Sequence, residues 1–480
     1  MSSPRRRSSG SQPSSPWREN RKNVAIVGGG LVGLLSAIYF SKRHFAIDVY
    51  EKRKDARNDK LISDRSINLA LSSRGIEALR KVGLAKDVLD NAIPMKGRMI
   101  HDKSGKTNIQ SYGMFGQVVY SIGRQKLHDI LLEMVDSLPN VNLHFENEAR
   151  EIDLDSSKIV LHDKDLNQLS DIYPDMVVGT DGAYSSVRRA IMKKEKMNFH
   201  QEYSNHGYKE LTIPPTSTGQ FAIKPNYLHI WPRNDFMIIA LPNQDKSFTC
   251  TCFFKYELFE KLSDSLMISE FFKKEFPDLL KVIGKDRLIN DFKSNPLGPL
   301  LTIKCHPYNH KDKAIILGDA AHCMVPFYGQ GLNCGFEDVK TLFRLIEKYE
   351  DDYELAFNTF SRIRHKDAVA ICDLSLENYT EMSSSVLSPF YKIERSIVNG
   401  LHWLFPTKII PLYTMVSFSQ ISYHNVVKKN RTQKLLIRLG MVAITAGSTL
   451  ALSSILLKRG FGKACVSTCM SIVSKCWDKK

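Results

Sequence analysis

The sequence predicts a mixed α/β (α+β) fold: a Rossmann-like nucleotide-binding domain with an inserted antiparallel-sheet substrate domain, a helical C-terminal region and a C-terminal transmembrane helix. Three observations lead to this prediction. Residues 23–51 read as strand, glycine-rich loop, helix and strand, residues 199–260 hold closely spaced strand-like runs, and residues 439–457 carry no charge. A chain of 480 residues is long enough for two or three domains.

The first element is a β-α-β opening. Residues 23–28 (NVAIVG) form the short apolar run of a buried parallel strand, 31–43 have helical character, and 45–50 (FAIDVY) read as a second strand. A further helix is expected at 124–135, where apolar residues recur at helical spacing.

The loop between the first strand and helix reads GGGLVG and fits the pattern GxGxxG. Gly28 permits the tight turn, Gly30 lets the backbone approach a pyrophosphate, and Gly33 lets helix and strand pack closely. Glu51 ends the second strand, where a carboxylate can accept hydrogen bonds from ribose hydroxyls. The motif predicts dinucleotide binding but does not separate FAD from NAD.

The middle of the chain changes character. The runs YLHIWP, FMIIALP and SFTCTCFF predict an inserted antiparallel sheet, in which Cys250 and Cys252 point to the same face. A buried-strand pattern returns at 313–318, and most of 336–425 favours helix. The expected parts are a disordered basic tail (1–22), the nucleotide-binding domain (23–198 and 306–345), the substrate domain (199–305), a helical region (346–430), a transmembrane anchor (439–457) and a basic tail (458–480).

The net charge of +16 is concentrated at the two ends of the chain. Residues 1–22 carry a net charge of +5 and residues 421–480 carry +10, so the region between them is nearly neutral. A nucleic-acid-binding domain would carry its excess charge on its folded surface, whereas basic tails suit anionic lipid surfaces. The nine scattered cysteines form no metal-binding pairs and favour a reducing compartment.

The uncharged stretch 439–457 is 19 residues long, which as a helix spans about 29 Å, close to the thickness of a bilayer's hydrocarbon core. Basic residues flank it on both sides, and the alternative is a buried core helix. The N-terminus lacks the apolar segment of a signal peptide. We therefore expect a tail anchor, with the body in the cytosol and the mitochondrial outer membrane as the location.

Two further motifs complete the pattern. One reads GTDGAYSSVR at 179–188, and the other reads GDAAH at 318–322, followed by Pro326 and GQGLN at 329–333. An Asp after a buried strand can bind a ribityl hydroxyl, and a glycine-rich loop entering a helix can direct N–H groups at the flavin and stabilise negative charge on it. His322 is given no chemical role.

These three motifs, in this order, resemble those of the class A flavoprotein aromatic hydroxylases, the group that includes para-hydroxybenzoate hydroxylase. The resemblance implies tightly bound FAD and transient NADPH, without a second GxGxxG. Longer runs, among them RSINLALS at 65–72, HGYKELTIPP, PNYLHIWPR and IPLYTMVSFS, resemble the kynurenine 3-monooxygenase family from about residue 23 to 460. That resemblance implies hydroxylation of L-kynurenine to 3-hydroxykynurenine with NADPH and O2 through a flavin C4a-hydroperoxide, with no catalytic side chain and no metal.

The resemblance also implies the site residues. Arg98, Tyr112, Asn378 and Tyr413 would contact the amino-acid part of the substrate, since a carboxylate suits a bidentate Arg. The ring would be walled by Leu228, Ile230, Phe253, Pro326 and Phe327, for which core packing is nearly as good an interpretation. FAD would contact Gly28, Gly30, Leu31, Val32, Gly33, Glu51, Arg53, Ala70, Arg124, Asp181, Gly182, Asp319, Pro326, Gly329, Gln330, Gly331, Leu332 and Asn333.

Three other interpretations stay open at this point. One is another class A hydroxylase, for instance one acting on a ubiquinone precursor. A second is a lipid-binding protein of the GDP-dissociation-inhibitor type, which should lack the second and third flavin motifs. The third is a degenerate membrane-bound scaffold.

Overall fold

The computed structural model describes residues 21–58, 68–384, 386 and 388–458. The chain divides into two compact units, Met1–His424 and Asn425–Lys480. The predictions for residues 1–20 and for most of the C-terminal tail fall outside the described residues, as do Arg65, Ser66 and Ile67 of one family-like run.

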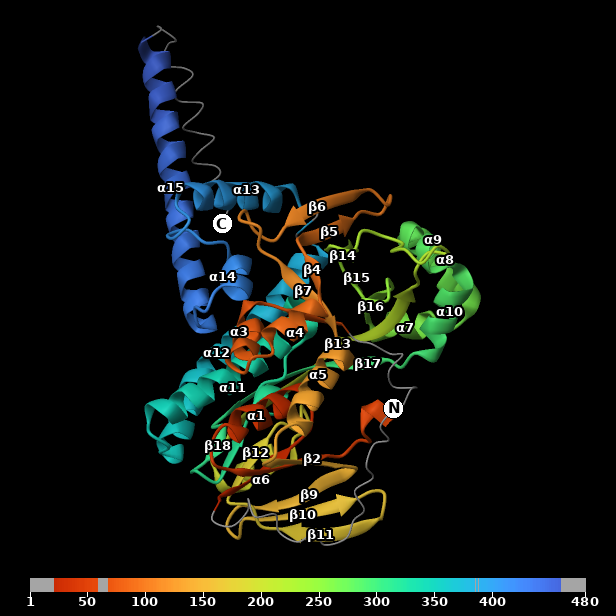
Figure 1. Cartoon of the computed structure of the whole chain (residues 1–480). Helices are drawn as coiled ribbons and strands as arrows, with labels where there is room; N and C mark the ends of the chain where they lie inside the picture. Colours follow the sequence, from red (N-terminus) through yellow and green to blue (C-terminus); the bar gives the residue numbers. More distant parts are fainter. Residues whose placement is uncertain (1–20, 59–67, 385, 387, 459–480) are drawn as a thin grey trace. The chain divides into compact units, whose positions relative to one another are not determined.

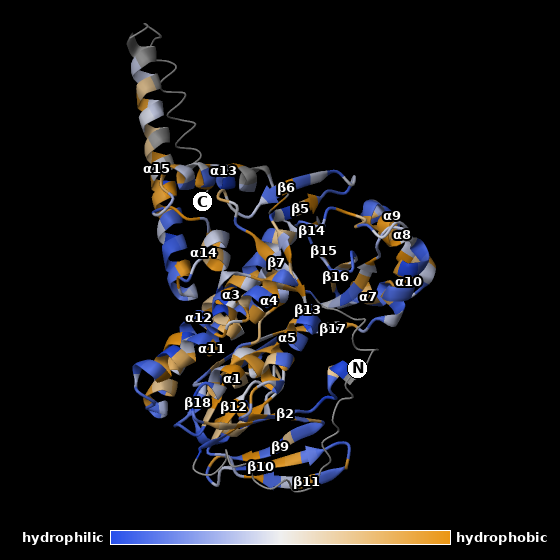
Figure 2. Ribbon diagram, in the orientation of Figure 1, coloured by the Kyte–Doolittle hydropathy of each residue, from blue (hydrophilic) through white to orange (hydrophobic). Residues whose placement is uncertain are grey.

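The predicted Rossmann-like domain is confirmed as a six-stranded sheet in the order β18-β19-β12-β1-β2-β8, with β1 parallel to both its neighbours. Apolar helices α1, α5 and α11 pack together against it and enclose the largest core of the protein (Figure 1; Figure 2). The elements are β1 (Asn23–Val27), β2 (Ala46–Glu51), β8 (Val141–Phe145), β12 (Met176–Gly179), β18 (Asn309–His310), β19 (Ala314–Ile316), α1 (Leu31–Ser41), α5 (Arg124–Asp136) and α11 (Gly331–Lys348).

The second large sheet has seven strands in the order β17-β13-β16-β15-β14-β5-β6. Its strands are β5 (Gly97–His101), β6 (Thr107–Ser111), β13 (Asn198–Ile213), β14 (Tyr227–Pro232), β15 (Met237–Pro242), β16 (Phe248–Lys255) and β17 (Gly298–His306). The sequence placed this sheet in 199–305 alone, whereas β5 and β6 join it from the preceding segment. The long-range parallel pairing of β5 with β14 has no local sequence signal.

Both faces of this sheet are buried at its centre, which explains why β15 and β16 are buried along nearly their whole length. One face carries Trp231, Cys250 and Cys252 and packs on helices α7 to α10, so the shared face of the two cysteines is confirmed. The opposite face carries Ile230 and Phe253 and belongs to a separate apolar cluster. The helices are α7 (Tyr256–Lys261), α8 (Ser265–Glu275), α9 (Pro277–Ile283) and α10 (Lys285–Ser294).

Smaller elements complete the fold. Two three-stranded sheets have the orders β3-β7-β4 and β11-β10-β9, and the long helix α12 contacts η3, β14 and β17. The strands are β3 (Asn68–Leu71), β4 (Ile93–Met95), β7 (Val119–Gly123), β9 (Asn147–Asp153), β10 (Lys158–Asp163) and β11 (Gln168–Ile172); the helices are η1 (Ala56–Asn58), α3 (Ser73–Lys81), α4 (Ala85–Asp90), α6 (Ser186–Lys194), η2 (Gly318–Ala320), η3 (Pro326–Tyr328), α12 (Tyr353–Ser383), α13 (Pro389–Leu404) and α14 (Leu412–Phe418).

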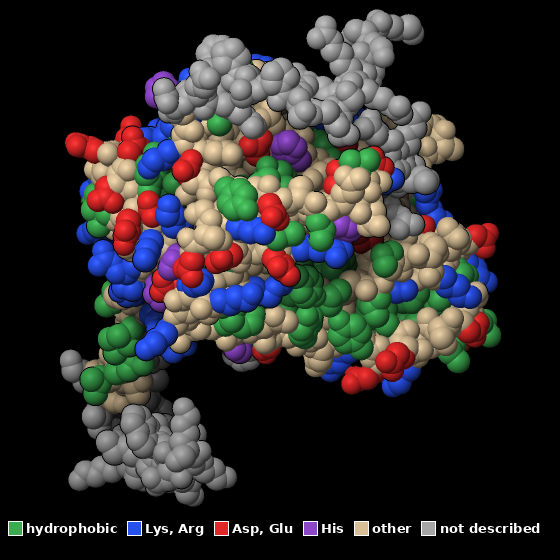
Figure 3. All heavy atoms as spheres, turned by 90° about the horizontal axis from the view of Figure 1, so that it is seen from below, with side chains coloured by type: hydrophobic (Ala, Val, Ile, Leu, Met, Phe, Trp, Pro, Cys, Tyr) green, Lys and Arg blue, Asp and Glu red, His purple; other side chains and the backbone are tan. Residues whose placement is uncertain are grey.

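Between its two basic ends the chain is nearly neutral. On the face shown in Figure 3, Lys, Arg, Asp and Glu side chains are interspersed rather than segregated by sign. This mixture of signs agrees with the near-zero net charge of residues 23–420.

The predicted transmembrane helix is the main expectation that the structure does not support. Residues 439–457 lie within α15 (Tyr423–Lys458), but none of the described helices combines the length and the hydropathy needed to cross a membrane. Seven of these 19 residues are Gly, Ser or Thr, which dilute the apolar side chains.

Candidate active site

The first glycine motif forms a tight turn between β1 and α1. Gly28 has φ +105°, and a Cβ at Gly33 would lie 1.9 Å from the Gly28 carbonyl oxygen, so neither position accepts a larger residue. A Cβ at Gly30, by contrast, would meet nothing within 4 Å. No side chain caps the N-terminus of α1. Open space beside Gly30 and an uncapped helix N-terminus fit the pyrophosphate of a dinucleotide.

Glu51 lies at the end of β2, where the sequence predicted it. Its Oε2 accepts a hydrogen bond from the Gly29 N–H at 2.9 Å, and its Oε1 accepts one from the Arg53 N–H at 2.9 Å. Both contacts fix the carboxylate beside the glycine turn. Glu51 and the turn therefore form one rigid unit.

The second motif lies beside the first, because β12 pairs with β1. One carboxylate oxygen of Asp181 accepts hydrogen bonds from the backbone N–H and hydroxyl of Ser186, at 2.6 and 2.8 Å. Its other oxygen, Oδ1, is buried without a partner. An orphaned buried acceptor at this position fits a ligand hydroxyl or N–H group.

Asn333 holds the third motif in place. Its Oδ1 accepts from the Ser72 N–H at 2.8 Å, and its Nδ2 donates to the carbonyl oxygens of Ala70 and Gly329 at 2.8 Å each. Asn333 thus fastens the end of β3 to the first turn of α11, which follows Gln330 and has no side-chain cap. Leu332 lies in the same turn.

The Asp319 residue is exposed between the buried Gly318 and Ala320, so its carboxyl borders open space. Desolvation raises the pKa of its carboxyl, against the opposing positive charges of His322 and Arg124. The three motifs therefore bring together open space, two uncapped helix N-termini and unpartnered polar groups, and this arrangement fits FAD.

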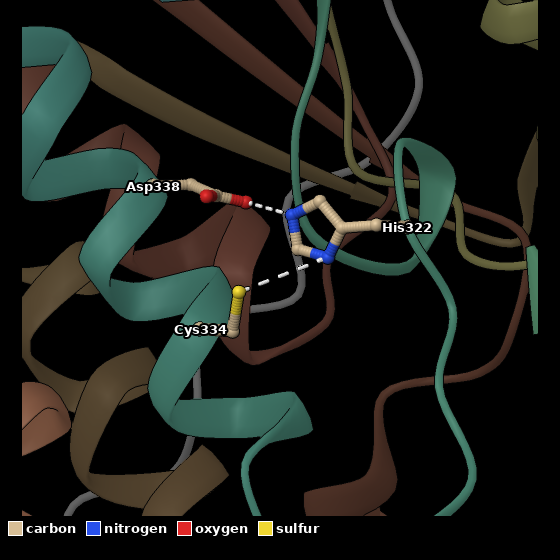
Figure 4. Close-up of side chains that lie close together, drawn as sticks. All are labelled: His322, Cys334 and Asp338. Atoms are coloured by element: carbon tan, nitrogen blue, oxygen red, sulfur yellow. Dashed lines mark hydrogen bonds and ion pairs between the residues drawn. The ribbon is translucent and has the colours of Figure 1, made fainter. Parts of the chain in front are cut away.

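His322 belongs to a buried polar cluster with Cys334 and Asp338 (Figure 4). His322 Nε2 lies 2.6 Å from Asp338 Oδ2, the Gly318 N–H also donates to this oxygen, and Arg364 Nε donates to Asp338 Oδ1. Burial opposes a charge on His322, but Asp338 outweighs it and raises the pKa of His322 well above its ordinary value. The Arg364 guanidinium also lies 3.3 Å from Cys334 Sγ, where it would repel a metal cation. The cluster is therefore a structural ion-pair network behind the third motif.

The second part of the site is centred on Arg98 in β5. Arg98 is 4% exposed and donates from one Nη atom to Glu381 Oε1 at 2.8 Å. Its guanidinium carbon lies 4.7 Å from the centre of the Tyr413 ring, and its Nε is buried without a partner. Desolvation would raise the pKa of Glu381, but the charge and hydrogen bond of Arg98 outweigh it and lower that pKa.

Aromatic rings continue from Arg98. Tyr112 and Tyr413 stack with ring centres 5.0 Å apart, and Tyr328 also stacks with Tyr413 at 5.6 Å. The structure thus brings Arg98, Tyr112 and Tyr413 together as predicted. Asn378 is also buried here, but its Nδ2 donates to the Phe327 carbonyl oxygen at 2.7 Å. That contact makes Asn378 a support for the apolar wall.

The residues predicted to wall the ring also converge. Leu228, Ile230, Phe253 and Phe327 share one apolar cluster, in which the rings of Phe253 and Phe327 meet edge to face at 4.9 Å. Ile230 and Phe253 are fully buried, whereas Pro326 is exposed beside them.

Sequence reasoning missed Glu381 and Tyr391. The Tyr391 hydroxyl donates to Glu381 Oε1 at 2.9 Å, so both residues belong to the Arg98 site. Glu381 could have been predicted from its spacing, because it follows Asn378 by three residues on one helix and residues three apart share a face.

Known proteins resemble this chain in both sequence and fold. A family model described as an FAD binding domain matches residues 21–375. The kynurenine 3-monooxygenase of Sus scrofa is 44% identical over 440 residues, covering 92% of this chain and 93% of its own. That of Anopheles gambiae is also 44% identical and covers 87% and 86%.

The chain belongs to the kynurenine 3-monooxygenase family. The family assignment removes the lipid-binding and scaffold interpretations: the chain is an FAD-dependent flavoprotein monooxygenase. The kynurenine 3-monooxygenase of Candida albicans agrees, at 44% identity over 86% of this chain and 92% of its own.

Solved structures confirm the mixed α/β aromatic-hydroxylase fold. The tetrameric 2-methyl-3-hydroxypyridine-5-carboxylic acid oxygenase superposes with a TM-score of 0.64 at 19% identity, covering 77% of this chain and 95% of its own. PqsL of Pseudomonas aeruginosa, described as a probable FAD-dependent monooxygenase, superposes with a TM-score of 0.61 at 18% identity, covering 76% and 97%.

Proposed function

We propose that this protein hydroxylates L-kynurenine at ring carbon 3 to give 3-hydroxykynurenine, with FAD as bound cofactor and NADPH and O2 as co-substrates. The observation that carries the substrate assignment is the ion pair between the buried Arg98 and the half-buried Glu381, beside an apolar aromatic cluster. A ligand with one zwitterionic end and one aromatic end fits this arrangement.

The charged end of the substrate would bind at Arg98. The Nε of Arg98 is buried without a partner, so a carboxylate gains a charge-assisted hydrogen bond that the free protein leaves unmade. The neighbouring Glu381 carboxylate offers a matching acceptor for the ammonium group. Tyr112 and Tyr413, whose rings stack on each other, would complete the contacts around the amino-acid end of the substrate.

The aromatic end would bind against the apolar wall. Leu228, Phe253 and Phe327 present carbon surface and no titratable group, so they orient the ring and exclude water. Asn378 holds the Phe327 backbone in place. Water exclusion protects the reactive oxygen species that this chemistry requires.

FAD would be held by the three motifs, with Gly30 at the pyrophosphate, Glu51 at the ribose, and Asp181 and Asp319 at hydroxyl groups. When bound, FAD would accept a hydride from NADPH and activate O2 for the hydroxylation. The uncapped N-terminus of α11 would stabilise negative charge on the cofactor. No side chain acts as a nucleophile.

The substrate assignment is tested by comparing three compounds in an NADPH-oxidation assay. L-kynurenine should stimulate oxidation strongly, whereas kynuramine, which lacks the carboxylate, should have a KM raised roughly 10- to 150-fold, because one to two charge-assisted hydrogen bonds are lost. A ubiquinone-precursor phenol serves as the third compound. Stimulation by the phenol but not by L-kynurenine would replace the proposal with the alternative hydroxylase.

We also propose that α15 attaches the protein to a membrane, with the mitochondrial outer membrane as the location and the catalytic body facing the cytosol. Support comes from the exposed apolar side chains Leu435, Leu436, Leu439, Val442 and Leu450, and from basic residues on both sides of 439–457. The test is subcellular fractionation followed by carbonate extraction. Recovery of the intact chain in the soluble fraction before extraction would refute attachment.

A further inference from the structure

A cavity of about 1300 Å3 lies among α1, α3, α11 and α12, and we call it the α11 cavity. None of its lining residues belongs to the three flavin motifs or to the Arg98 site. Glu337 stands in its wall, whereas the next residue, Asp338, accepts a hydrogen bond from the Gly318 N–H of the third motif. The α11 cavity is therefore separate from the FAD and substrate sites.

Most carboxylates that line the α11 cavity are already neutralised by neighbouring cations. The ion pairs are those of Glu77 with Arg80, Glu337 with Arg74 and Arg364, Asp351 with Arg43, and Asp367 with Arg364. Within the part of the chain that the structure describes, Glu347 is the one lining carboxylate without an ion-pair partner. The walls therefore offer little free negative charge.

Positive charge is in excess on the same walls. Five lining cations have no carboxylate partner among the described residues, and they are Lys22, Lys42, Lys81, Lys340 and Arg344. Five cations less the one carboxylate of Glu347 leave four uncompensated positive charges. The Lys42 ammonium donates to the Lys81 carbonyl oxygen at 3.1 Å, so the ends of α1 and α3 meet at this cavity. A ligand with several negative charges fits these walls.

Lys340 is the most enclosed of these five cations. It is half-buried on α11, and its Nζ donates to the Gln420 side-chain oxygen at 2.6 Å. Burial lowers the pKa of Lys340, although the charges of Glu337 and Glu77 oppose this shift. Arg344 follows four residues later on the same helix face, and its charge also lowers this pKa. Because like charges at this spacing destabilise a helix, an anion bound beside both would stabilise the arrangement.

We propose that the α11 cavity binds a small molecule carrying a di- or triphosphate group, with its phosphates at Lys340 and Arg344. Lys and Arg are the side chains that bind phosphate, and each phosphate group brings up to about two negative charges. A cavity of this size accommodates a molecule as large as a nucleotide. A nucleotide and inorganic pyrophosphate share the polyphosphate chemistry, and the experiment below distinguishes them. The proposal does not depend on the assignment of L-kynurenine.

The test is calorimetric titration of the full-length, FAD-loaded protein with ATP, inorganic pyrophosphate and adenosine in magnesium-free buffer. We expect ATP and pyrophosphate to bind and adenosine, which lacks phosphate, not to bind. Flavin absorbance should stay unchanged during the titration, because the α11 cavity is separate from the flavin motifs. Tighter binding of ATP than of pyrophosphate supports the proposal with a nucleotide as ligand, and equal binding supports it with the inorganic anion.

Two double variants locate the binding. K340Q/R344Q removes both proposed phosphate contacts and should bind ATP roughly 10- to 100-fold more weakly. The matched control R362Q/K366Q removes the same two charge types at the same spacing on α12. Neither Arg362 nor Lys366 lines the α11 cavity, so this control should bind ATP as the parent protein does. Thermal unfolding without ligand shows whether each variant is folded.

Four results would overturn the proposal. Equal ATP affinity of K340Q/R344Q and its control would mean that ATP binds elsewhere on the protein. Adenosine binding as tight as that of ATP would exclude recognition of the phosphates. Release of FAD on addition of ATP would show that ATP occupies the flavin site instead. Absence of binding by both ATP and pyrophosphate would leave the excess positive charge of the α11 cavity without this role.

Discussion

Replacing Arg98 by Ala tests the substrate site most sharply. The change removes the guanidinium that would bind the substrate carboxylate and leaves the half-buried Glu381 without its ion-pair partner. Two charge-assisted hydrogen bonds to the carboxylate contribute about 1.5–3 kcal/mol each, or about 3–6 kcal/mol of binding free energy together. We therefore expect kcat/KM for L-kynurenine to fall roughly 150- to 20,000-fold, mostly through KM.

The assay is kynurenine-dependent NADPH oxidation, with FAD content measured by flavin absorbance in the same sample. Arg80→Ala is the matched control, because Arg80 is an exposed cation on α3 that pairs with Glu77. The double variant R98A/E381A removes the stranded carboxylate and should recover thermal stability but not KM. Loss of FAD from R98A, or an unchanged KM, would refute the assignment of Arg98 to the substrate.

Further predictions concern the cofactor site and the core. Gly30→Ala should fold normally, because its Cβ meets nothing within 4 Å, but it should bind FAD roughly 10- to 100-fold more weakly. The control Gly400→Ala is equally free of neighbours and should keep its FAD. Equal FAD content in the two variants would contradict the assignment of Gly30 to the pyrophosphate. Asn333→Ala leaves three backbone groups unpaired, so it should lower the free energy of unfolding by about 2–5 kcal/mol and also lower the FAD content. Loss of stability without loss of FAD would contradict a role of Asn333 in the cofactor site. Desolvation lowers the pKa of His229 to about 3. The unfolded chain therefore binds this proton first, and the free energy of unfolding should fall below about pH 6.5 by up to about 1.4 kcal/mol per pH unit. His229→Gln should lose that part of the slope in urea unfolding across pH, and an unchanged slope would show that His229 is not the group responsible.

The sequence predicted those parts of the site that depend on local backbone geometry. The turn at Gly28 and Gly33 could be located because the motif imposes its own conformation between strand and helix. Cys250 and Cys252 could be assigned a shared face because strand side chains alternate.

The remaining features depend on contacts between distant segments. Glu381 lies 283 residues from Arg98, and no local pattern indicated that they pair. The addition of β5 to the seven-stranded sheet also depends on long-range pairing. The transmembrane prediction relied on an absence of charge, although Gly, Ser and Thr lower the hydropathy of the same stretch.

The central claim is tested most directly by incubating the purified holoprotein with L-kynurenine, NADPH and 18O2 and measuring the product by mass spectrometry. We expect 3-hydroxykynurenine carrying one 18O atom, formed only when both L-kynurenine and NADPH are present. NADPH oxidation that L-kynurenine does not stimulate, or a product without 18O, would contradict it.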